Sequence, residues 1–253
     1  MGRIIAIANQ KGGVAKTTTA VNLSASLALN GKKVLLLDID PQGNASSGLG
    51  LDRINTEHCI YDVLINGVPM ESVVLKTDIK GLSIVPATIQ LAGAEIELVS
   101  AISRELKLKR AIEHIKPDYD YLILDCPPSL GLLTLNALTC ADTLLIPIQC
   151  EYYALEGLSQ LMNTVRLVQK HLNRKLELEG VVLTMFDART NLSIEVVDEV
   201  KVYFKQKVFR SIVPRNVRVS EAPSHGLPVV IYDPKSKGSE VYMELAEEVM
   251  ANG

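Results

Sequence analysis

Tryptophan is absent from this sequence of 253 residues, and phenylalanine occurs only three times. The apolar residues, 47% of the total, are therefore mainly aliphatic. Val, Ile and Leu are typical of parallel strands that helices cover on both faces of a sheet. A chain of this length and apolar content can bury a single core. The composition favours one α/β domain.

Paired cysteines are also missing. The four cysteines show no CxxC spacing and lie in apolar stretches: Cys59, Cys126, Cys140 and Cys150. This pattern argues against a disulfide framework and against a zinc site. Cys126 follows an aspartate, a setting that suggests redox chemistry or a cluster ligand, but it has no matched second cysteine. We expect buried, reduced thiols of a cytosolic protein.

Long apolar runs are missing too, since no stretch reaches the ~18 residues of a membrane-spanning helix. The N-terminal apolar run is too short for a secretory signal peptide, and the protein is expected to be soluble and cytoplasmic. No Pro/Gly/Ser-rich linker or internal repeat divides the chain. The first strand already begins near residue 3. We therefore expect one domain over residues 1–253, with no separate DNA-binding domain.

Short apolar runs alternate with longer segments of helical period. Strands are predicted over residues 4–8, 33–37, 82–85, 121–124, 143–147 and 180–185. Helices are predicted over residues 17–30, 101–116, 153–172, 191–205 and 240–251, and Gly31 is expected to cap the first of them. This alternation predicts a doubly wound, mostly parallel sheet with helices on both faces.

Charge is unevenly distributed, although the formal net charge is only -3. Residues 166–218 hold eleven Lys and Arg against six acidic residues, a net of +5. The overall charge argues against a generally basic nucleic-acid binder. A local excess of this size is by itself typical of ordinary solvated helix faces.

The strongest motif lies between a predicted strand and a predicted helix and reads Lys11-Gly12-Gly13-Val14-Ala15-Lys16-Thr17-Thr18. In that setting, consecutive backbone N–H groups and the positive end of the helix dipole bind phosphates. Lys16 can reach the outer phosphates and Thr17 can coordinate Mg²⁺. The general GxxxxGK[ST] pattern is nevertheless not matched, because Gln10 and Ala15 occupy its two glycine positions.

Two further predicted strands end in carboxylates. Asp38-Ile39-Asp40 ends the second strand, and Asp125 follows the strand predicted over residues 121–124. Open α/β sheets bind ligands outside the carboxyl ends of their strands. The sequence therefore predicts that these aspartates lie beside the phosphate loop.

Several segments resemble one family. Residues 11–18 resemble the deviant Walker A motif, KGGxGK[TS], with Lys11 as its additional signature lysine. Asp40 is similar to the switch I aspartate of that family, and residues 125–129 resemble Walker B running into switch II. Residues 150–157 and 213–226 resemble the chromosomal ParA group. Over nearly its whole length the chain is thus similar to the ParA/MinD-type ATPases, which are single-domain P-loop NTPases.

The resemblance implies ATP and Mg²⁺ as cofactors and a role for individual residues. It assigns nucleotide binding to Lys11, Gly12, Gly13, Val14, Ala15, Lys16, Thr17 and Thr18, with Pro214 and Asn216 around the adenine. It assigns the metal to Thr17, Asp40 and Asp125, and catalysis to Lys11, Lys16 and Asp40. Lys11 would reach across a dimer interface onto the partner's phosphates, in the manner of an arginine finger.

The function implied by the resemblance is partitioning of a chromosome or plasmid. ATP would close a sandwich dimer that binds double-stranded DNA without sequence preference, through Arg189 and Arg218 among others. A ParB-type partner would stimulate slow ATP hydrolysis and release the DNA. Contacts to phosphate would make this binding fall steeply with salt. A cytoplasmic, nucleoid-associated protein is expected.

Two other functions occur in proteins with the same loop. A MinD-like membrane switch needs a basic amphipathic C-terminal helix, whereas residues 240–253 are acidic and contain no Lys or Arg. An electron-transfer ATPase like the nitrogenase iron protein needs paired cysteines for a cluster, and Cys126 and Cys140 lack the expected glycine-rich settings. Both alternatives are disfavoured.

Three positions remain open. Glycine is expected before Lys16, and if that position needs positive φ, Ala15 should weaken nucleotide binding or distort the loop. The chain would then bind nucleotide poorly or barely hydrolyse it. Asp38 is either a second candidate for the role of Asp40 or an acceptor of structural hydrogen bonds. His225, in a turn-rich loop, is expected to be structural.

Overall fold

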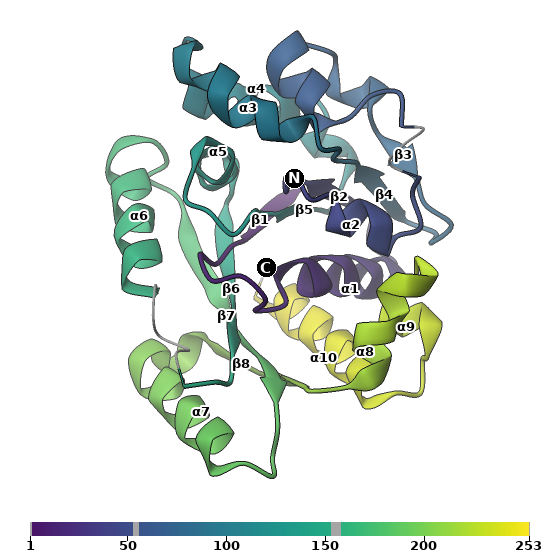
Figure 1. Ribbon diagram of the computed structural model, residues 1–253, viewed down its shortest axis with the longest axis vertical. Helices are drawn as coiled ribbons and strands as arrows, with labels where there is room; N and C mark the ends of the chain where they lie inside the picture. Colours follow the sequence, from purple (N-terminus) through teal and green to yellow (C-terminus); the bar gives the residue numbers. More distant parts are fainter. Residues whose placement is uncertain (1, 53–55, 153–157, 253) are drawn as a thin grey trace.

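A single eight-stranded sheet runs through the computed structural model, which describes residues 2–52, 56–152 and 158–252. The strand order is β3-β4-β2-β5-β1-β6-β7-β8, and every neighbouring pair is parallel except β3 with β4 (Figure 1). The strands are β1 (Arg3–Ile7), β2 (Val34–Asp38), β3 (Leu75–Lys76), β4 (Leu82–Val85), β5 (Tyr121–Asp125), β6 (Thr143–Gln149), β7 (Glu177–Phe186) and β8 (Val208–Pro214). The predicted mostly parallel sheet is confirmed.

Helices cover both faces of the sheet (Figure 1). The core of one face receives side chains from α1 (Lys16–Leu29), α2 (Asn44–Gly48), α8 (Val217–Glu221), α9 (Val229–Tyr232) and α10 (Lys237–Ala251). The core of the other face receives them from α3 (Leu91–Glu97), α4 (Lys107–Ile112), α5 (Leu132–Cys140), α6 (Leu158–His171) and α7 (Asn191–Phe204). The described residues thus form the expected three-layered α/β fold.

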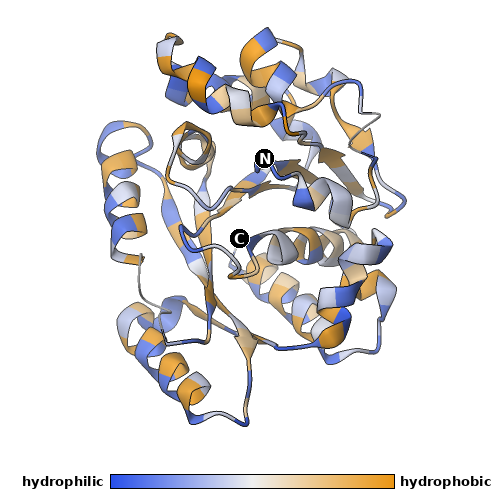
Figure 2. Ribbon diagram, in the orientation of Figure 1, coloured by the Kyte–Doolittle hydropathy of each residue, from blue (hydrophilic) through white to orange (hydrophobic). Residues whose placement is uncertain are grey.

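The strands divide their side chains between these two cores, because successive residues of a strand point to opposite faces. In β2, Leu35 and Leu37 pack into one core and Leu36 into the other, and all three are fully buried. Both faces of a central strand are therefore apolar, which explains its unbroken hydrophobic sequence. The helices instead mix hydrophobic and hydrophilic residues along their turns, as α6 and α7 show in Figure 2.

Helix α1 is fixed at both ends. At its C-terminus, Gly31 has a φ of 80°, and its N–H donates to the carbonyl of Ala28 at 2.9 Å. The N–H of Lys32 donates to the carbonyl of Leu27 at 3.2 Å, which completes a Schellman cap. The predicted C-cap glycine is confirmed. At the other end, Lys16 begins the helix directly after the phosphate loop.

The helix predicted over residues 101–116 is wrong in its extent. Only Lys107–Ile112 is α-helical, after a 3₁₀ turn at Arg104–Leu106. Ser103 precedes that turn with a φ of 53°, a left-handed conformation that interrupts a regular helix. A second 3₁₀ turn at Lys116–Asp118, which contains a proline, follows the helix. Helical periodicity in the sequence therefore spans three short elements.

Other boundaries also differ from the prediction. Helix α10 begins at Lys237 rather than at residue 240, because the Ser236 side chain accepts a hydrogen bond from the N–H of Ser239 and caps it. The first part of the helix predicted over residues 153–172 lies outside the described residues. Strand β8 and helix α5 were not predicted. α5 is buried on most sides and shows no polar face, so its periodicity is weak.

Candidate functional site

The candidate residues converge on the carboxyl edge of the sheet. Residues 8–15 follow β1, Asp38 ends β2, and Asp125 ends β5. Strand β5 pairs with both neighbours, so that Asp125 lies opposite Ile7 of β1 and opposite Asp38 of β2. The phosphate loop and the two strand-end carboxylates, which are far apart in the sequence, are therefore neighbours in space.

The phosphate loop is open where a ligand would approach. A Cβ built on Gly12 or Gly13 meets no heavy atom within 4 Å, and Gly13 has a φ of 73°. Lys16 is only 7% exposed, and its Nζ donates to the carbonyl oxygen of Lys11 at 3.1 Å. The loop therefore curls around the Lys16 ammonium at the N-terminus of α1. Backbone N–H groups and a cation in this arrangement provide an anion site.

Ala15 occupies a conformation that suits glycine. It has φ 66° and ψ 33° and forms the N-cap of α1 without a side-chain hydrogen bond to the helix. For an L-residue this left-handed region costs roughly 1–2 kcal/mol. The position does use positive φ, which was the condition set by the sequence for strain in the loop. The alanine keeps the loop geometry at a local conformational cost.

Lys11 is anchored through its backbone. Its N–H donates to Oδ1 of Asn9 at 3.0 Å, and Nδ2 of Asn9 donates to the carbonyl oxygen of Pro147 at 2.8 Å. Asn9 is 6% exposed and joins the loop to the end of β6. The Lys11 side chain is partly exposed. Asn9 carries no motif signal of its own and was not predicted from the sequence.

The burial of Asp125 is only partly offset by neighbouring groups. The residue is fully buried, and neither of its carboxylate oxygens accepts a hydrogen bond that satisfies normal geometry within the described residues. Burial, followed by the nearby charge of Asp38, raises the pKa of Asp125 well above its usual range, while the Thr17 hydroxyl close by lowers it. An unpaired buried carboxylate next to a threonine hydroxyl suits a cation.

The described residues hold no group of three or more His, Cys, Asp or Glu that could bind a metal ion by themselves. A metal at this edge would therefore depend on Thr17, on a carboxylate and on ligand oxygens. Mg²⁺ is usually bound in this way, through one or two protein groups together with phosphate oxygens and waters. The buried Asp125 and the donor set present fit Mg²⁺ better than a metal held by protein ligands alone.

Asp38 and Asp40 have different surroundings. Oδ1 of Asp38 accepts from the N–H of Asp40 at 3.3 Å, and Oδ2 accepts from the N–H and the hydroxyl of Ser46 at 2.8 and 2.7 Å. Oδ1 of Asp40 accepts from the N–H of Gln42 at 2.9 Å. Both oxygens of Asp38 are thus used in structural hydrogen bonds, and Asp40 is the better candidate for chemistry.

The electrostatics of Lys16 depend on these aspartates. Burial lowers the pKa of Lys16, whereas the negative charges of Asp125 and Asp40 raise it. Burial also raises the pKa of Asp38 to about 6. Lys16 and the three aspartates lie in one poorly solvated region, so a change in the charge of one alters the pKa of the others.

A second pocket adjoins the loop. It has a volume of about 270 Å³ and is lined in part by Ala15 and Thr18 from the loop side and by Pro214 and Asn216 from the segment after β8. The two residues expected around the adenine therefore lie beside the phosphate loop. Oδ1 of Asn216 caps α8 by accepting from the N–H groups of residues 218 and 219. The amide nitrogen of Asn216 takes no part in this cap.

The lining also includes Val213, Arg215, Val219, Ser220 and Pro223, which belong to the segment 213–226 that resembles the ParA group. Three further lining residues were not singled out from the sequence: Thr184, Met185 and Tyr242. Met185 has a φ of 52°, at a register irregularity between β7 and β8. Tyr242 is fully buried, and its hydroxyl lies 3.4 Å from that of Thr19. Thr184 and Met185 on one side and Tyr242 on the other come from distant segments, so no local motif predicts them.

The two arginines expected to contact DNA lie near the ends of β7 and β8. Arg189 donates to both oxygens of Asp187, at 2.9 and 2.7 Å, and its side chain is 86% exposed. Arg218 contacts Glu221 at 3.0 Å and Asp233 at 3.3 Å. Each guanidinium is exposed and already paired with acids on its own surface. Contact with another anion would require it to exchange partners.

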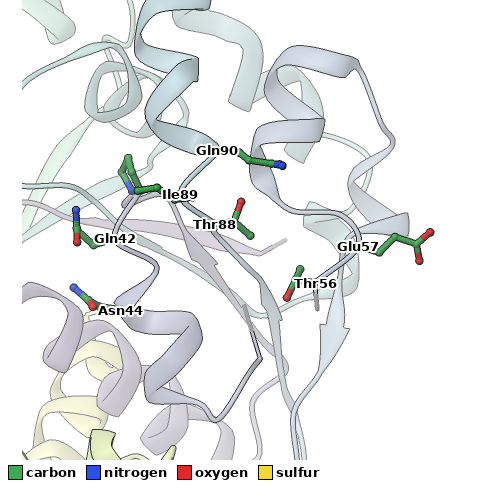
Figure 3. A pocket seen from close by; sticks show the side chains of 8 residues that line it. Gln42, Asn44, Thr56, Glu57, Thr88, Ile89 and Gln90 are labelled. Atoms are coloured by element: carbon green, nitrogen blue, oxygen red, sulfur yellow. The ribbon is translucent and has the colours of Figure 1, made fainter. Parts of the chain in front are cut away.

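Another pocket, of about 550 Å³, lies on the other side of the Asp40 turn. Figure 3 shows Gln42 and Asn44 along one side of it, Thr56 and Glu57 along the other, and residues 88–90 between them. Its lining is mainly amide and hydroxyl groups. The turn that carries Asp40 thus forms one wall of a cavity that is separate from the phosphate loop.

Two structural expectations are confirmed. All four cysteines are free and buried, and burial raises the pKa of the Cys126 thiol well above its usual range. The ring of His225 stacks on that of Tyr232, with 4.7 Å between their centroids. Neither Cys126 nor His225 has the surroundings of a reactive group.

Replacement of Ala15 by glycine should relieve the backbone strain in the phosphate loop. We expect Ala15→Gly to leave the free energy of unfolding unchanged or raise it by up to about 1 kcal/mol, because the left-handed strain outweighs the extra entropy of the unfolded chain. Nucleotide affinity should be preserved or increased. Ala28→Gly, within α1, is the control and should lose about 1 kcal/mol. Equal decreases in the free energy of unfolding for both variants, measured by urea unfolding, would contradict the assignment of backbone strain to Ala15.

The stability of the ligand-free protein should depend on Asp38. Its pKa is about 6 in the folded protein, above the ordinary value of 3.8, so the folded state binds this proton more tightly. The free energy of unfolding should therefore fall as the pH rises from about 4 through about 6. Asp38→Asn should flatten this fall, whereas Asp78→Asn, at an exposed position, should not. Parallel urea-unfolding profiles for the wild type and Asp38→Asn would refute this assignment.

Known proteins with similar sequences cover the whole chain. A family model described as "AAA domain" matches residues 2–178. The sporulation initiation inhibitor protein Soj of Bacillus subtilis is 65% identical over 253 residues, which is 100% of both chains. The chromosome partitioning protein ParA of Myxococcus xanthus is 57% identical, over 99% of this chain and 88% of its own length.

Solved structures show the same fold with nucleotides. Cobyrinic acid a,c-diamide synthase from Mycobacterium smegmatis, with bound ADP and magnesium, is 40% identical with a TM-score of 0.86, over 98% of this chain and 93% of that chain. The septum site-determining protein MinD from Pyrococcus horikoshii, complexed with Mg-ADP, is 28% identical with a TM-score of 0.82, over 98% and 96%. The chain therefore belongs to the AAA-domain family of P-loop ATPases that includes the chromosome-partitioning proteins ParA and Soj.

Proposed function

We propose that this protein is a ParA-type ATPase that partitions a chromosome or plasmid. The observation that carries the proposal is the buried Asp125 carboxylate, without a hydrogen-bond partner in the described part of the chain, beside a phosphate loop with two lysines. Such a carboxylate needs a cation, and such a loop needs an anion. ATP with Mg²⁺ supplies both. Sequence similarity to Soj and ParA over at least 99% of this chain supports the same conclusion.

In the proposed reaction, the loop N–H groups and Lys16 bind the phosphates and stabilise the charge that develops during transfer. Thr17 and, through a water, Asp125 would hold Mg²⁺, which would supply positive charge next to the phosphates. Pro214 and Asn216 line the pocket beside the loop, which we assign to the adenine. The position of these groups at the carboxyl edge of the sheet supports the proposed roles.

Asp40 is the proposed residue for the attacking water, which it orients or polarises, and it supports the metal. It is 6% exposed, and its backbone N–H is held by Asp38. A fixed carboxylate beside the phosphate loop can position a water for in-line attack. Asp38 cannot replace it without losing its hydrogen bonds to Ser46.

Lys11 is proposed to act on the partner subunit. Within one chain its backbone carbonyl accepts from Lys16, while its side chain is partly exposed at the loop. A lysine there can reach phosphates across a dimer interface and supply a charge that a single chain lacks. Each site of the ATP-dependent sandwich dimer would then be complete only when the two loops face one another.

DNA binding is assigned to the exposed arginines at the ends of β7 and β8. Arg189 and Arg218 belong to the segment with a net charge of +5, and Arg215 lies close enough to Asp187 to lower its pKa together with Arg189. Phosphates would displace the acids that pair with these guanidinium groups. Such binding is independent of sequence and weakens with salt. It needs no separate DNA-binding domain within residues 1–253.

The remaining parts of the proposal concern the cell. A ParB-type partner stimulates hydrolysis and releases the dimer from DNA, and the protein is cytoplasmic and associated with the nucleoid. These assignments rest on similarity to the chromosome-partitioning relatives. The slow intrinsic turnover expected of the family follows if a completed site requires both the second subunit and the partner.

Membrane attachment of the MinD kind is less well supported. Within the described residues, no helix is long and apolar enough to cross a membrane. Helix α10 could only lie on a surface, and it carries four glutamates against the single Lys237. A helix that binds anionic lipid needs basic residues on its polar face. Its buried residues, including Tyr242 and Leu245, already pack against the sheet core.

Loss of hydrolysis through Ala15 is the second alternative. The residue has the left-handed φ that glycine tolerates better, which specifically favours a weakened loop. Weak binding and slow chemistry are distinguished by measuring ATP affinity directly and then the rate with DNA and partner. Normal affinity with stimulated turnover would exclude impairment by Ala15.

ATP-dependent DNA binding provides the direct test of the proposal. We expect Arg218→Ala to abolish or strongly weaken binding to non-specific DNA and to reduce the slope of log K against log salt by about one per lost contact. ATP affinity should stay unchanged. Arg174→Ala is the control, because this exposed arginine precedes β7 and lies towards the opposite edge of the sheet. It should bind DNA like the wild type.

The wild-type protein should bind DNA with ATP and Mg²⁺ and release it at high salt. Binding that is equal with and without ATP, or that is insensitive to salt, would overturn the proposed function. Binding that Arg218→Ala and Arg174→Ala weaken equally would instead show that the DNA surface has been assigned to the wrong edge.

A further inference from the structure

The Ser46 hydroxyl joins two loops at the carboxyl edge of the sheet. It donates to Oδ2 of Asp38 at 2.7 Å and accepts from the backbone N–H of Ala87 at 3.0 Å. Asp38 ends β2 and Ala87 follows β4, the strand that pairs with β2. Ser46, Asp38 and Ala87 are all fully buried. Protein groups therefore satisfy one another here, away from solvent.

Asp38, which Ser46 holds, in turn contacts the backbone of Asp40. While Oδ2 of Asp38 is held by Ser46, Oδ1 accepts from the backbone N–H of Asp40 at 3.3 Å. The carbonyl of Asp40 accepts from the N–H of Gly43 at 2.8 Å, so the turn closes on itself. The position of the Asp40 carboxylate thus depends on Asp38, and that of Asp38 on Ser46.

The hydrogen bond from the Ala87 N–H to Ser46 connects the loop that follows β4 to the same hydroxyl. Residues 88–90 follow Ala87 directly and line the pocket of about 550 Å³, between Gln42 and Asn44 on one side and Thr56 and Glu57 on the other (Figure 3). The N–H of Ile60 also donates to the carbonyl of Pro86 at 2.9 Å, which fixes the start of the same loop. The Asp40 turn and the loop at residues 86–90, which both contribute to the lining of this pocket, are therefore linked through the Ser46 hydroxyl, by its buried hydrogen bonds with Asp38 and Ala87.

We propose that Ser46 is a positioning residue for ATP hydrolysis, which places Asp40 through Asp38 and couples the Asp40 turn to the loop at residues 86–90. The inference rests on the proposed ATPase function. Ser46 does not touch the nucleotide in this scheme, because its hydroxyl is already used by Asp38 and Ala87. Its loss should therefore disturb the chemical step rather than nucleotide binding.

Steady-state hydrolysis with Ser46→Ala tests the positioning role. The KM for ATP should stay within about twofold, while kcat falls roughly ten- to a hundredfold, as expected for a small displacement of a catalytic group. Ser46→Thr keeps the hydroxyl and should recover most of kcat. Ser24→Ala is the matched control, since Ser24 is also fully buried but its hydroxyl has no hydrogen-bond partner in the described part of the chain. It should leave both parameters unchanged.

Two results would overturn the positioning role. One is a wild-type kcat in Ser46→Ala. The other is a parallel loss of ATP affinity, which would make Ser46 part of the binding site or of general stability. Failure of the proposed function itself looks different, because the wild-type protein would then neither bind nor hydrolyse ATP.

Amide hydrogen exchange in the wild type tests the coupling even if Ser46→Ala does not fold. A non-hydrolysable ATP analogue with Mg²⁺ should slow exchange at residues 10–18 and also at residues 86–90. In a folded Ser46→Ala protein the first effect should remain and the second should be lost. Protection of residues 10–18 alone in the wild type would contradict the coupling.

Discussion

The organisation of this protein depends on one electrostatic constraint, the burial of Asp125 at the end of a central strand. The carboxylate is fully buried and has no hydrogen-bond partner that satisfies normal geometry in the described part of the chain. Burial raises its pKa, and the Lys16 ammonium close by is held in place by the loop backbone. A buried charge of this kind is costly unless a cation joins it. Two solved relatives hold ADP with magnesium, and the binding of ATP with Mg²⁺ that we propose for this chain would meet that requirement.

The parallel sheet creates the constraint. Because β5 lies between β1 and β2, the phosphate loop, Asp38 and Asp125 emerge side by side at one edge. Helix α1 points its N-terminus at the same place. Asp38 is held by Ser46, and Asp40 is the carboxylate that we propose for chemistry. Two neighbouring carboxylates of similar sequence context thus differ in their hydrogen bonds.

Much of the sheet and the phosphate loop could be predicted from local sequence, because strand and helix periodicity and the loop motif lie within short segments. All six predicted strands occur, but α5 was missed because it has no polar face. The roles of Asn9, Ser46 and Tyr242 could not be predicted, since each depends on a contact with a distant residue. The conformation of Ala15 was anticipated as a condition, and only the structure supplied its φ of 66°.

The central claim is that nucleotide closes a dimer in which Lys11 completes the partner's site. Mixing two inactive variants, Lys11→Ala and Asp40→Ala, tests it most directly. Each mixed dimer would contain one site with an intact Asp40 and the partner's intact lysine. Random mixing should therefore restore about a quarter of the wild-type ATPase activity. A mixture as inactive as either variant alone, with both variants still binding ATP, would contradict the claim.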